Sequence, residues 1–161
     1  MRKEIHTWVP ALEGTILEVG KRRIDSNQNS PYPQSFGVDM LPGHGVDLVC
    51  DAVSLPFEDN SWDHVVCFET LEHVEFWREV LTEMWRVCRD TMVITTPTEA
   101  KKFHGYPHDY WRWKEKQWLE VFRKQEVLKS GKVWKKGIGI HVRKLDDRLD
   151  LTVEPKRITR S

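Results

Sequence analysis

Two short apolar runs that each end at an acidic side chain constrain the fold of this chain most strongly. Residues 46–50 lead into Asp51, and residues 62–68 lead into Glu69, with a turn-rich stretch between the two runs. Short apolar runs bounded by turn signals predict buried strands. In open α/β sheets, ligands bind in the crevice outside the carboxyl ends of the strands. We therefore expect the functional site where these two runs end.

Further apolar runs predict additional strands, and two amphipathic stretches predict helices. In residues 74–88 apolar side chains recur at intervals of three and four, which is typical of a helix packed on a sheet. Residues 114–124 predict a second helix, and residues 126–133 with 138–142 predict a closing hairpin. The other predicted strands are 15–20, 36–40 and 91–97. This alternation indicates an α/β fold, a doubly wound Rossmann-like and mostly parallel sheet of about seven strands with an antiparallel C-terminal hairpin.

Length and composition narrow the class of protein. The 161 residues suffice for one domain, which we place at 1–144, followed by a charged tail at 145–161 that we expect to be frayed or disordered. Lys plus Arg and Asp plus Glu both number 25, so no global field favours nucleic acid or an anionic membrane. No apolar stretch approaches the roughly 20 residues of a membrane span. We expect a cytoplasmic protein whose three cysteines, lacking metal-ligand spacing, stay reduced.

Acidic side chains lie at the ends of successive predicted strands. Asp39 lies 19 positions after Gly20, close to the spacing at which an acidic side chain meets a ribose hydroxyl in nucleotide-binding βαβ units. A carboxylate suits a ribose diol because it accepts two hydrogen bonds at once. Asp also ends strands as a turn former, so either interpretation fits Asp39 taken alone. The complete set of acids favours a ligand: Glu18, Asp39, Asp51 and Glu69.

These residues resemble successive motifs of the class I methyltransferases that use S-adenosylmethionine, in particular the type 11 branch. The resemblance extends from about residue 15 to residue 97, with the motifs in their usual order. Each motif is weak alone, and five in register are specific. The matching segments are Ile16-Leu-Glu-Val-Gly20, Gly37-Val-Asp39, Asp51-Ala-Val-Ser-Leu-Pro-Phe57, Asn60-Ser-Trp-Asp-His-Val-Val66 and Glu69-Thr-Leu-Glu-His-Val74.

The resemblance implies S-adenosylmethionine as the cofactor and assigns roles to residues near its methionine part. Glu18 and Gly20 would shape the loop beneath the methionine. Glu69 would lie at the methionine end, where a ligand that carries an ammonium and a sulfonium makes negative charge favourable. A cationic cofactor explains acidic strand ends better than a dinucleotide does.

The adenosine part of the cofactor is assigned to the next two strand ends by the same resemblance. Asp39, followed by Met40, would take the ribose hydroxyls, and Asp51 with Ala52 would bracket the adenine. The family usually has two more glycines after Gly20, whereas this chain continues with three basic residues at 21–23. Those side chains either point away from the cofactor or crowd it, and they also fit a solvated loop.

A loop rich in aromatic and histidine residues follows the last predicted parallel strand, so the topology places it over the same crevice. His108 or Asp109 would accept a proton from a hydroxyl or amine acceptor. Alternatively, Asp109 caps the helix near residue 114 and the aromatic side chains seal the sheet. The substrate-side candidates are His104, Tyr106, Tyr110 and Trp111.

His73 is the other candidate base. It follows the strand 62–68 and lies beside Glu69 and Glu72, and carboxylates favour the charged form of an imidazole and hold it in one orientation. It equally fits a first-turn residue that bonds to its own loop. We expect no metal, because the spacing of His104 and His108 across a Gly-Tyr-Pro run does not match a helical pair.

The sequence therefore predicts an enzyme that transfers a methyl group from S-adenosylmethionine to an oxygen or nitrogen atom of a small-molecule acceptor. Neutral charge weakens the case for a nucleic acid acceptor and does not remove it. The alternative is a non-catalytic module of the same fold that has lost the cofactor and acts as an interaction subunit. A nucleotide-sugar or nicotinamide-dependent enzyme is disfavoured, since no phosphate-cradling glycine loop is present.

Overall fold

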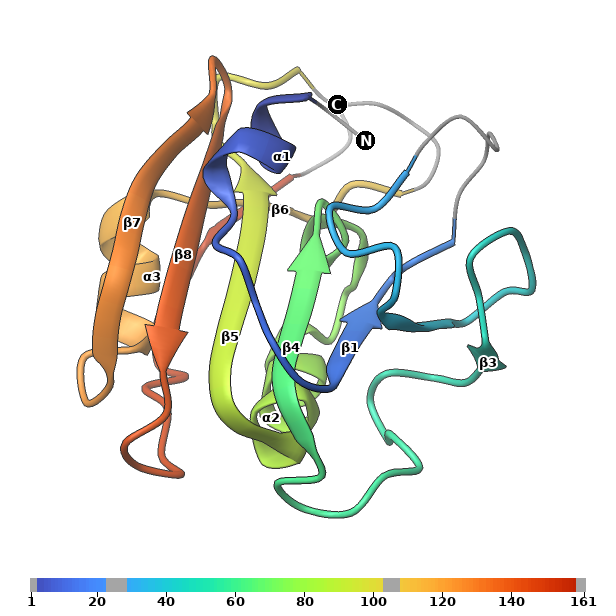
Figure 1. Cartoon of the computed structure of the whole chain (residues 1–161). Coiled ribbons are helices and arrows are strands. Elements are labelled where there is room, and N and C mark those ends of the chain that lie inside the picture. Colours follow the sequence, from blue (N-terminus) through green and yellow to red (C-terminus); the bar gives the residue numbers. More distant parts are fainter. Residues whose placement is uncertain (1–2, 23–28, 103–107, 159–161) are drawn as a thin grey trace.

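A seven-stranded sheet organises the protein in the computed structural model, which describes residues 3–22, 29–102 and 108–158. Its strand order is β3-β2-β1-β4-β5-β8-β7 (Figure 1). The pairs from β3 to β5 are parallel, and β8 is antiparallel to both β5 and β7. The predicted fold class is confirmed. The strands are β1 (Ile16–Val19), β2 (Phe36–Asp39), β3 (Leu48–Val49), β4 (Trp62–Phe68), β5 (Cys88–Pro97), β7 (Glu126–Trp134) and β8 (Gly137–Arg143).

Helices α2 (Trp77–Val87) and α3 (Glu115–Val121) cover one face of this sheet (Figure 1). The apolar stripe of α2 is buried as its three-and-four spacing predicts, with Trp77, Leu81 and Met84 all at 0% exposure. These side chains join the inward residues of β4 and β5 in the larger hydrophobic core. Because α2 packs on β4 and β5, it holds the two strands from which the loops of the candidate site begin.

The other face is covered by the short helix α1 (Lys3–Trp8) and by extended chain (Figure 1). Ile5 and Trp8 pack with Val66 and Val93 in a second, smaller core. The links between β1 and β2, β2 and β3, and β3 and β4 contain no helix within their described residues. Within the described ranges, no helix has both the length and the apolar character needed to cross a bilayer.

The predicted elements match the structure with small changes of boundary. Strand β4 has the predicted bounds, β3 is shorter, and β5 begins at Cys88 because α2 passes into it without a loop. A 3₁₀ turn, η1 (Leu71–His73), lies between β4 and α2. This turn keeps Glu72 and His73 close to the carboxyl end of β4.

The C-terminal segment is the main correction to the sequence-based prediction. Residues 145–158 lie along the α2 side of the molecule and are not a frayed tail over this range. Strand β9 (Lys156–Arg157) pairs antiparallel with β6 (Trp111–Arg112). The Arg78 guanidinium donates to the carbonyl oxygens of Leu151 and Val153 at 2.8 and 3.0 Å. One arginine side chain thus binds two backbone carbonyl groups of this segment. The high content of charged residues, on which the prediction of a frayed tail rested, does not reveal this contact.

Candidate active site

The carboxyl ends of the parallel strands bring the predicted cofactor residues to one edge of the sheet. Gly20, Asp39, Asp51 and Glu69 follow or end β1, β2, β3 and β4 respectively. Gly20 has φ +79°, and a Cβ there would overlap the Thr70 side chain. The loop after β1 and the loop after β4 are thus in direct contact, as a shared site requires.

Glu69 has a backbone conformation that non-glycine residues seldom adopt, with φ +49°. Its backbone N–H donates to the carbonyl oxygen of Thr95 at 2.9 Å, which ties it to the end of β5. Its carboxylate lies 3.7 Å from the Lys101 ammonium. Strained residues of this kind concentrate at functional sites, and here the strain turns the chain from β4 into η1.

The link between β1 and β2 is held from inside the protein by Glu18. This carboxylate, 1% exposed, accepts hydrogen bonds from the hydroxyls of Ser30 and Ser35, the latter at 2.9 Å. Glu18 therefore points to the α1 side of the sheet. Its hydrogen bonds hold the segment between β1 and β2, whose described residues contain no helix. This placement is compatible with the predicted role in shaping the loop.

Lys21 turns away from the strand ends. Its ammonium donates to the carbonyl oxygen of Ser35, and its aliphatic stem covers Gly37, where any Cβ would overlap it. Arg22 lies beside Gly43 in the turn after β2, and Arg23 lies outside the described residues. The basic side chains were expected either to point away from the cofactor or to crowd it, and the Lys21 side chain points away.

The ends of β2 and β3 combine carboxylates with exposed apolar side chains. Asp39 accepts a hydrogen bond from the Leu41 backbone N–H at 3.0 Å, and Asp51 accepts one from Val53 at 3.1 Å. Met40 is 64% exposed. The predicted residue Ala52 is half-buried against the larger core. Large apolar side chains that stay exposed beside hydrogen-bonding carboxylates are a feature of surfaces that receive an amphipathic ligand.

A cluster of buried charged side chains lies at the ends of β4 and β5. Its members are Glu72 and His73 from η1, and Asp109 and Arg112 from the segment after β5. Glu72 and Asp109 are 0% exposed, Arg112 is 1% exposed and His73 is 18% exposed. Arg112 forms an ion pair with Asp109 and donates to the carbonyl oxygens of Trp111 and Lys101. Paired in this way, the charges of Asp109 and Arg112 are compatible with burial.

The hydrogen bonds of His73 define its tautomer. Its Nδ1 lies 3.0 Å from the backbone carbonyl oxygen of His108 and 3.3 Å from Asp109 Oδ1. A carbonyl oxygen only accepts, so Nδ1 carries the hydrogen and Nε2 of the neutral ring carries the lone pair. Nε2 lies 3.8 Å from Glu72 Oε1. The orientation of His73 is therefore fixed by its Nδ1 side.

Burial raises the pKa of Glu72 to about 8, and the neighbouring Glu69 carboxylate adds to the shift. Removing a carboxylate from water disfavours its charged form, and a like charge nearby does the same. Sequence analysis noted Glu72 only as a neighbour of His73, and it missed Arg112. Residues 109–112 lie outside any helix, so the spacing of Asp109 and Arg112 gave no sequence signal for their ion pair.

The segment after β5 forms the wall of this cluster. The Tyr110 N–H donates to the carbonyl oxygen of Glu72 at 2.7 Å, and the Trp111 indole donates to that of Val74 at 2.9 Å. Trp111 is buried at 7% exposure, so it seals the sheet edge, and the rings of His108 and Tyr110 pack with centroids 4.4 Å apart. The predicted residues His104 and Tyr106 lie outside the described residues.

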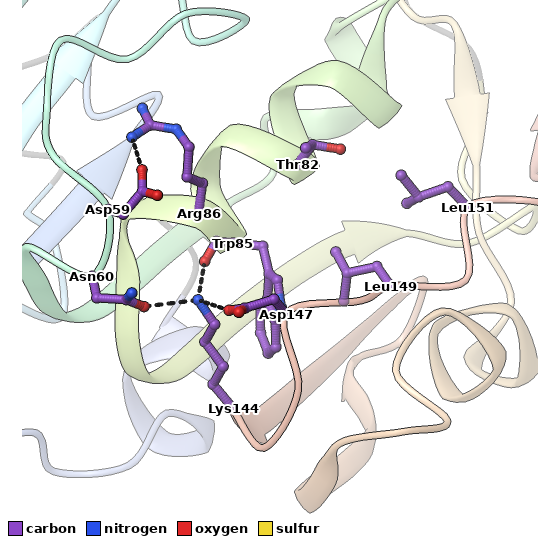
Figure 2. A pocket seen from close by; sticks show the side chains of 9 residues that line it. All are labelled: Asp59, Asn60, Thr82, Trp85, Arg86, Lys144, Asp147, Leu149 and Leu151. Atoms are coloured by element: carbon purple, nitrogen blue, oxygen red, sulfur yellow. Dashed lines mark hydrogen bonds and ion pairs between the residues drawn. The ribbon is translucent and has the colours of Figure 1, made fainter.

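A hollow of about 440 Å³ lies at the opposite, amino end of the parallel strands. Figure 2 shows the Lys144 ammonium between Asn60 and Asp147 in this hollow. The ammonium also contacts the carbonyl oxygens of Trp85 and Cys88, each at 3.0 Å. Its hydrogen-bonding capacity is used by the protein itself, so the hollow is a structural junction at the end of α2.

Comparisons with known proteins agree with this geometry. A family model described as "Methyltransferase domain" matches residues 19–94. Demethylmenaquinone methyltransferase of Bacillus mycoides (strain KBAB4) is 32% identical over 106 residues, which are 64% of this chain and 45% of that protein. The corresponding protein of Bacillus cereus (strain B4264) is 33% identical with the same coverage. The chain thus spans less than half the length of these curated relatives.

Solved structures share the fold at low sequence identity. The 1,6-didemethyltoxoflavin-N1-methyltransferase of Burkholderia thailandensis, solved with 1,6-didemethyltoxoflavin and S-adenosylhomocysteine, has a TM-score of 0.67 at 14% identity, covering 83% of this chain and 72% of its own. A SAM-dependent methyltransferase of Thermotoga maritima, described as a possible histamine N-methyltransferase, has a TM-score of 0.62 at 14% identity, covering 88% and 86%. Residues 19–94, just under half of the chain, are thus similar in sequence to the methyltransferase domain, and the solved structures share the fold of the whole sheet.

Proposed function

We propose that the protein transfers a methyl group from S-adenosylmethionine to an oxygen or nitrogen atom of a small-molecule acceptor. The observation that carries this proposal is the convergence of Gly20, Asp39, Asp51 and Glu69 at one sheet edge, in the stretch that matches the methyltransferase domain. The direction of the Lys21 side chain supports it further, because its ammonium binds the carbonyl oxygen of Ser35 and turns away from the strand ends.

The residues at this edge fit the chemistry of the cofactor. Asp39 would accept the ribose hydroxyls, and Asp51 with Ala52 would bracket the adenine, whose apolar face suits the exposed Met40 side chain. Glu69 would lie near the positive charges of the methionine part. When bound, the cofactor supplies a methyl carbon activated by a sulfonium leaving group.

The acceptor would be held on the side of the buried charged cluster. In-line displacement requires alignment of donor and acceptor and exclusion of water more than strong acid or base chemistry. The segment from His108 to Arg112, anchored by Tyr110 and Trp111 to η1, supplies a rigid wall. His73 would take the proton from a protonated acceptor, because Asp109 and the His108 carbonyl hold its Nδ1 side and so fix the orientation of the ring.

A small acceptor is supported by the nature of the wall. Its anchors are single residues of the short segment that follows β5. The Burkholderia thailandensis neighbour is named for a small heterocyclic acceptor, which is compatible with such a site on this fold.

Calorimetric titration with S-adenosylhomocysteine tests the proposal. We expect saturable binding to the unmodified protein, and for Asp39→Ala a dissociation constant raised by about ten-fold to a hundred-fold, the usual cost of losing hydrogen bonds to a charged acceptor. Asp147→Ala, at the amino end of the strands, is the matched control and should bind as the unmodified protein does. No binding at high ligand excess would favour the non-catalytic interaction module, and equal affinity of Asp39→Ala would remove that residue from the site.

A further inference from the structure

Glu69 and Lys101 form an ion pair at the sheet edge where the proposed cofactor residues meet. The Lys101 ammonium lies 3.7 Å from the Glu69 carboxylate, and the two side chains are 19% and 22% exposed respectively. This separation is longer than a direct hydrogen bond between a nitrogen and an oxygen atom. Two opposite charges therefore face each other at a partly exposed place without being joined by a hydrogen bond.

The chain around Glu69 places this ion pair next to the loop after β1. The Glu69 N–H donates to the carbonyl oxygen of Thr95 at the end of β5. Thr70, the next residue, occupies the position that a Cβ on Gly20 would need. The ion pair thus lies close to Gly20, and Gly20 and Glu69 are the two residues that the resemblance assigns to the methionine part of the cofactor.

The backbone of Lys101 is held in place from inside the protein. Its N–H donates to the carbonyl oxygen of Thr98 at 3.0 Å, and its own carbonyl oxygen accepts a hydrogen bond from Arg112 Nε at 3.3 Å. Arg112 is 1% exposed and forms an ion pair with the buried Asp109. A buried guanidinium therefore fixes the point from which the Lys101 side chain extends toward Glu69.

The amino-acid end of S-adenosylmethionine carries the same two charges as this ion pair, an ammonium and a carboxylate on one carbon atom. Glu69 complements the ammonium and Lys101 complements the carboxylate. Partly exposed ion pairs contribute little net stability, and the lysine ammonium lies on a flexible stem, so Lys101 can turn from one carboxylate to another at little cost. Hydrogen bonds between two charged groups are short and strong, which favours the contact with the ligand over the 3.7 Å contact with Glu69.

We propose that Lys101 binds the carboxylate of the cofactor's methionine part while Glu69 binds its ammonium. The two side chains then select ligands that have a complete amino-acid end. This inference rests on the proposed methyl transfer, and it adds to that site a binding residue from the segment after β5.

Calorimetric titration with two ligands tests the inference. The first is S-adenosylhomocysteine, and the second is its decarboxylated analogue, which keeps the ammonium and lacks only the carboxylate. The unmodified protein should bind the analogue about ten-fold more weakly than S-adenosylhomocysteine. Lys101→Met, which keeps an unbranched side chain and removes the charge, should lose about ten-fold in affinity for S-adenosylhomocysteine and none for the analogue.

Two further variants complete the experiment. Lys102→Met changes the exposed neighbouring lysine and is the matched control. It should bind both ligands as the unmodified protein does. Glu69→Gln should weaken both ligands by about ten-fold, because both carry the ammonium.

Three results would overturn the inference while the proposed methyl transfer stands. They are unchanged affinity of Lys101→Met for S-adenosylhomocysteine, an equal loss for both ligands in that variant, which would mean that Lys101 only supports the loop, and unchanged affinity of Glu69→Gln. An unmodified protein that binds no S-adenosylhomocysteine would instead overturn the proposed function, and this inference with it.

Discussion

Glu72 makes the stability of the protein depend on pH in a direction opposite to that of most carboxyl groups. Its pKa is about 8 in the folded protein and about 4.3 in an unfolded chain, so the folded state binds more protons between these values. Stability is therefore greatest below about pH 4 as far as this group is concerned, and it falls as pH rises to about 8.

Replacing Glu72 by Gln should remove this dependence. Relative to the unmodified protein, the free energy of unfolding of Glu72→Gln should rise from pH 5 to pH 8.5, by an amount on the order of a few kcal/mol. Urea denaturation at the two pH values measures the difference, with Glu75→Gln as the control that should show little change. Parallel pH dependence in Glu72→Gln and the unmodified protein would contradict the raised pKa.

Gly20 is required for two separate reasons. Its φ is +79°, and a Cβ would overlap Thr70. Gly20→Ala should therefore cost more stability than Gly131→Ala, where φ is +129° and the added Cβ meets only Glu115 Oε1 at 3.9 Å. We expect about 1 kcal/mol for Gly131→Ala and about 2–4 kcal/mol for Gly20→Ala. Equal urea midpoints for the two variants would show that Thr70 yields without cost.

At the scale of elements, the C-terminal segment supports the acceptor wall. The carbonyl oxygens of Leu151 and Val153 are bound by Arg78 of α2, and the Ile158 N–H donates to the carbonyl oxygen of Tyr110 at 2.7 Å. The wall thus depends on a hydrogen-bond network that begins on the helix and passes along β9 to β6.

Removing the Arg78 guanidinium should loosen this network. In Arg78→Ala, amide hydrogen exchange in β6 and in residues 149–158 should accelerate about ten-fold or more, since three charge-assisted hydrogen bonds to Leu151, Val153 and Glu154 are lost. Mass spectrometry of peptic fragments measures the change. Arg148→Ala is the control, because Arg148 forms its ion pair within its own turn with Asp146. Unchanged exchange in Arg78→Ala would mean that β6 is held without the C-terminal segment.

At the scale of the whole molecule, the two ends of the parallel sheet carry different sets of charged residues. The carboxyl end carries the proposed cofactor and acceptor residues, while at the amino end the Lys144 ammonium is bound by side-chain and carbonyl oxygens of the protein itself. Binding of S-adenosylhomocysteine should therefore slow hydrogen exchange around Gly20, Asp39, Asp51 and Glu69 and leave residues 144–151 unchanged. Protection confined to residues 144–151 would place the ligand at the wrong end.

The sequence predicted the sheet, which the structure confirms, and one half of the candidate site. Apolar runs predict strands because buried β-strands need apolar side chains on both faces, and acids that follow successive parallel strands must meet at one edge. Asp39, Asp51 and Glu69 were found in this way, and the position of α2 followed from the spacing of its apolar residues.

Only the tertiary structure decided the other half. Glu72 and Asp109 are distant in sequence, and their approach on either side of His73 depends on how η1 packs against the segment after β5. His108 contributes its backbone carbonyl to His73, a contact to which its residue type gives no clue. The direction of Lys21 follows from a hydrogen bond to a backbone carbonyl, and the order of residues 145–158 depends on several hydrogen bonds to backbone carbonyls. Contacts of this kind leave no periodic pattern in the sequence, because backbone acceptors are the same at every residue.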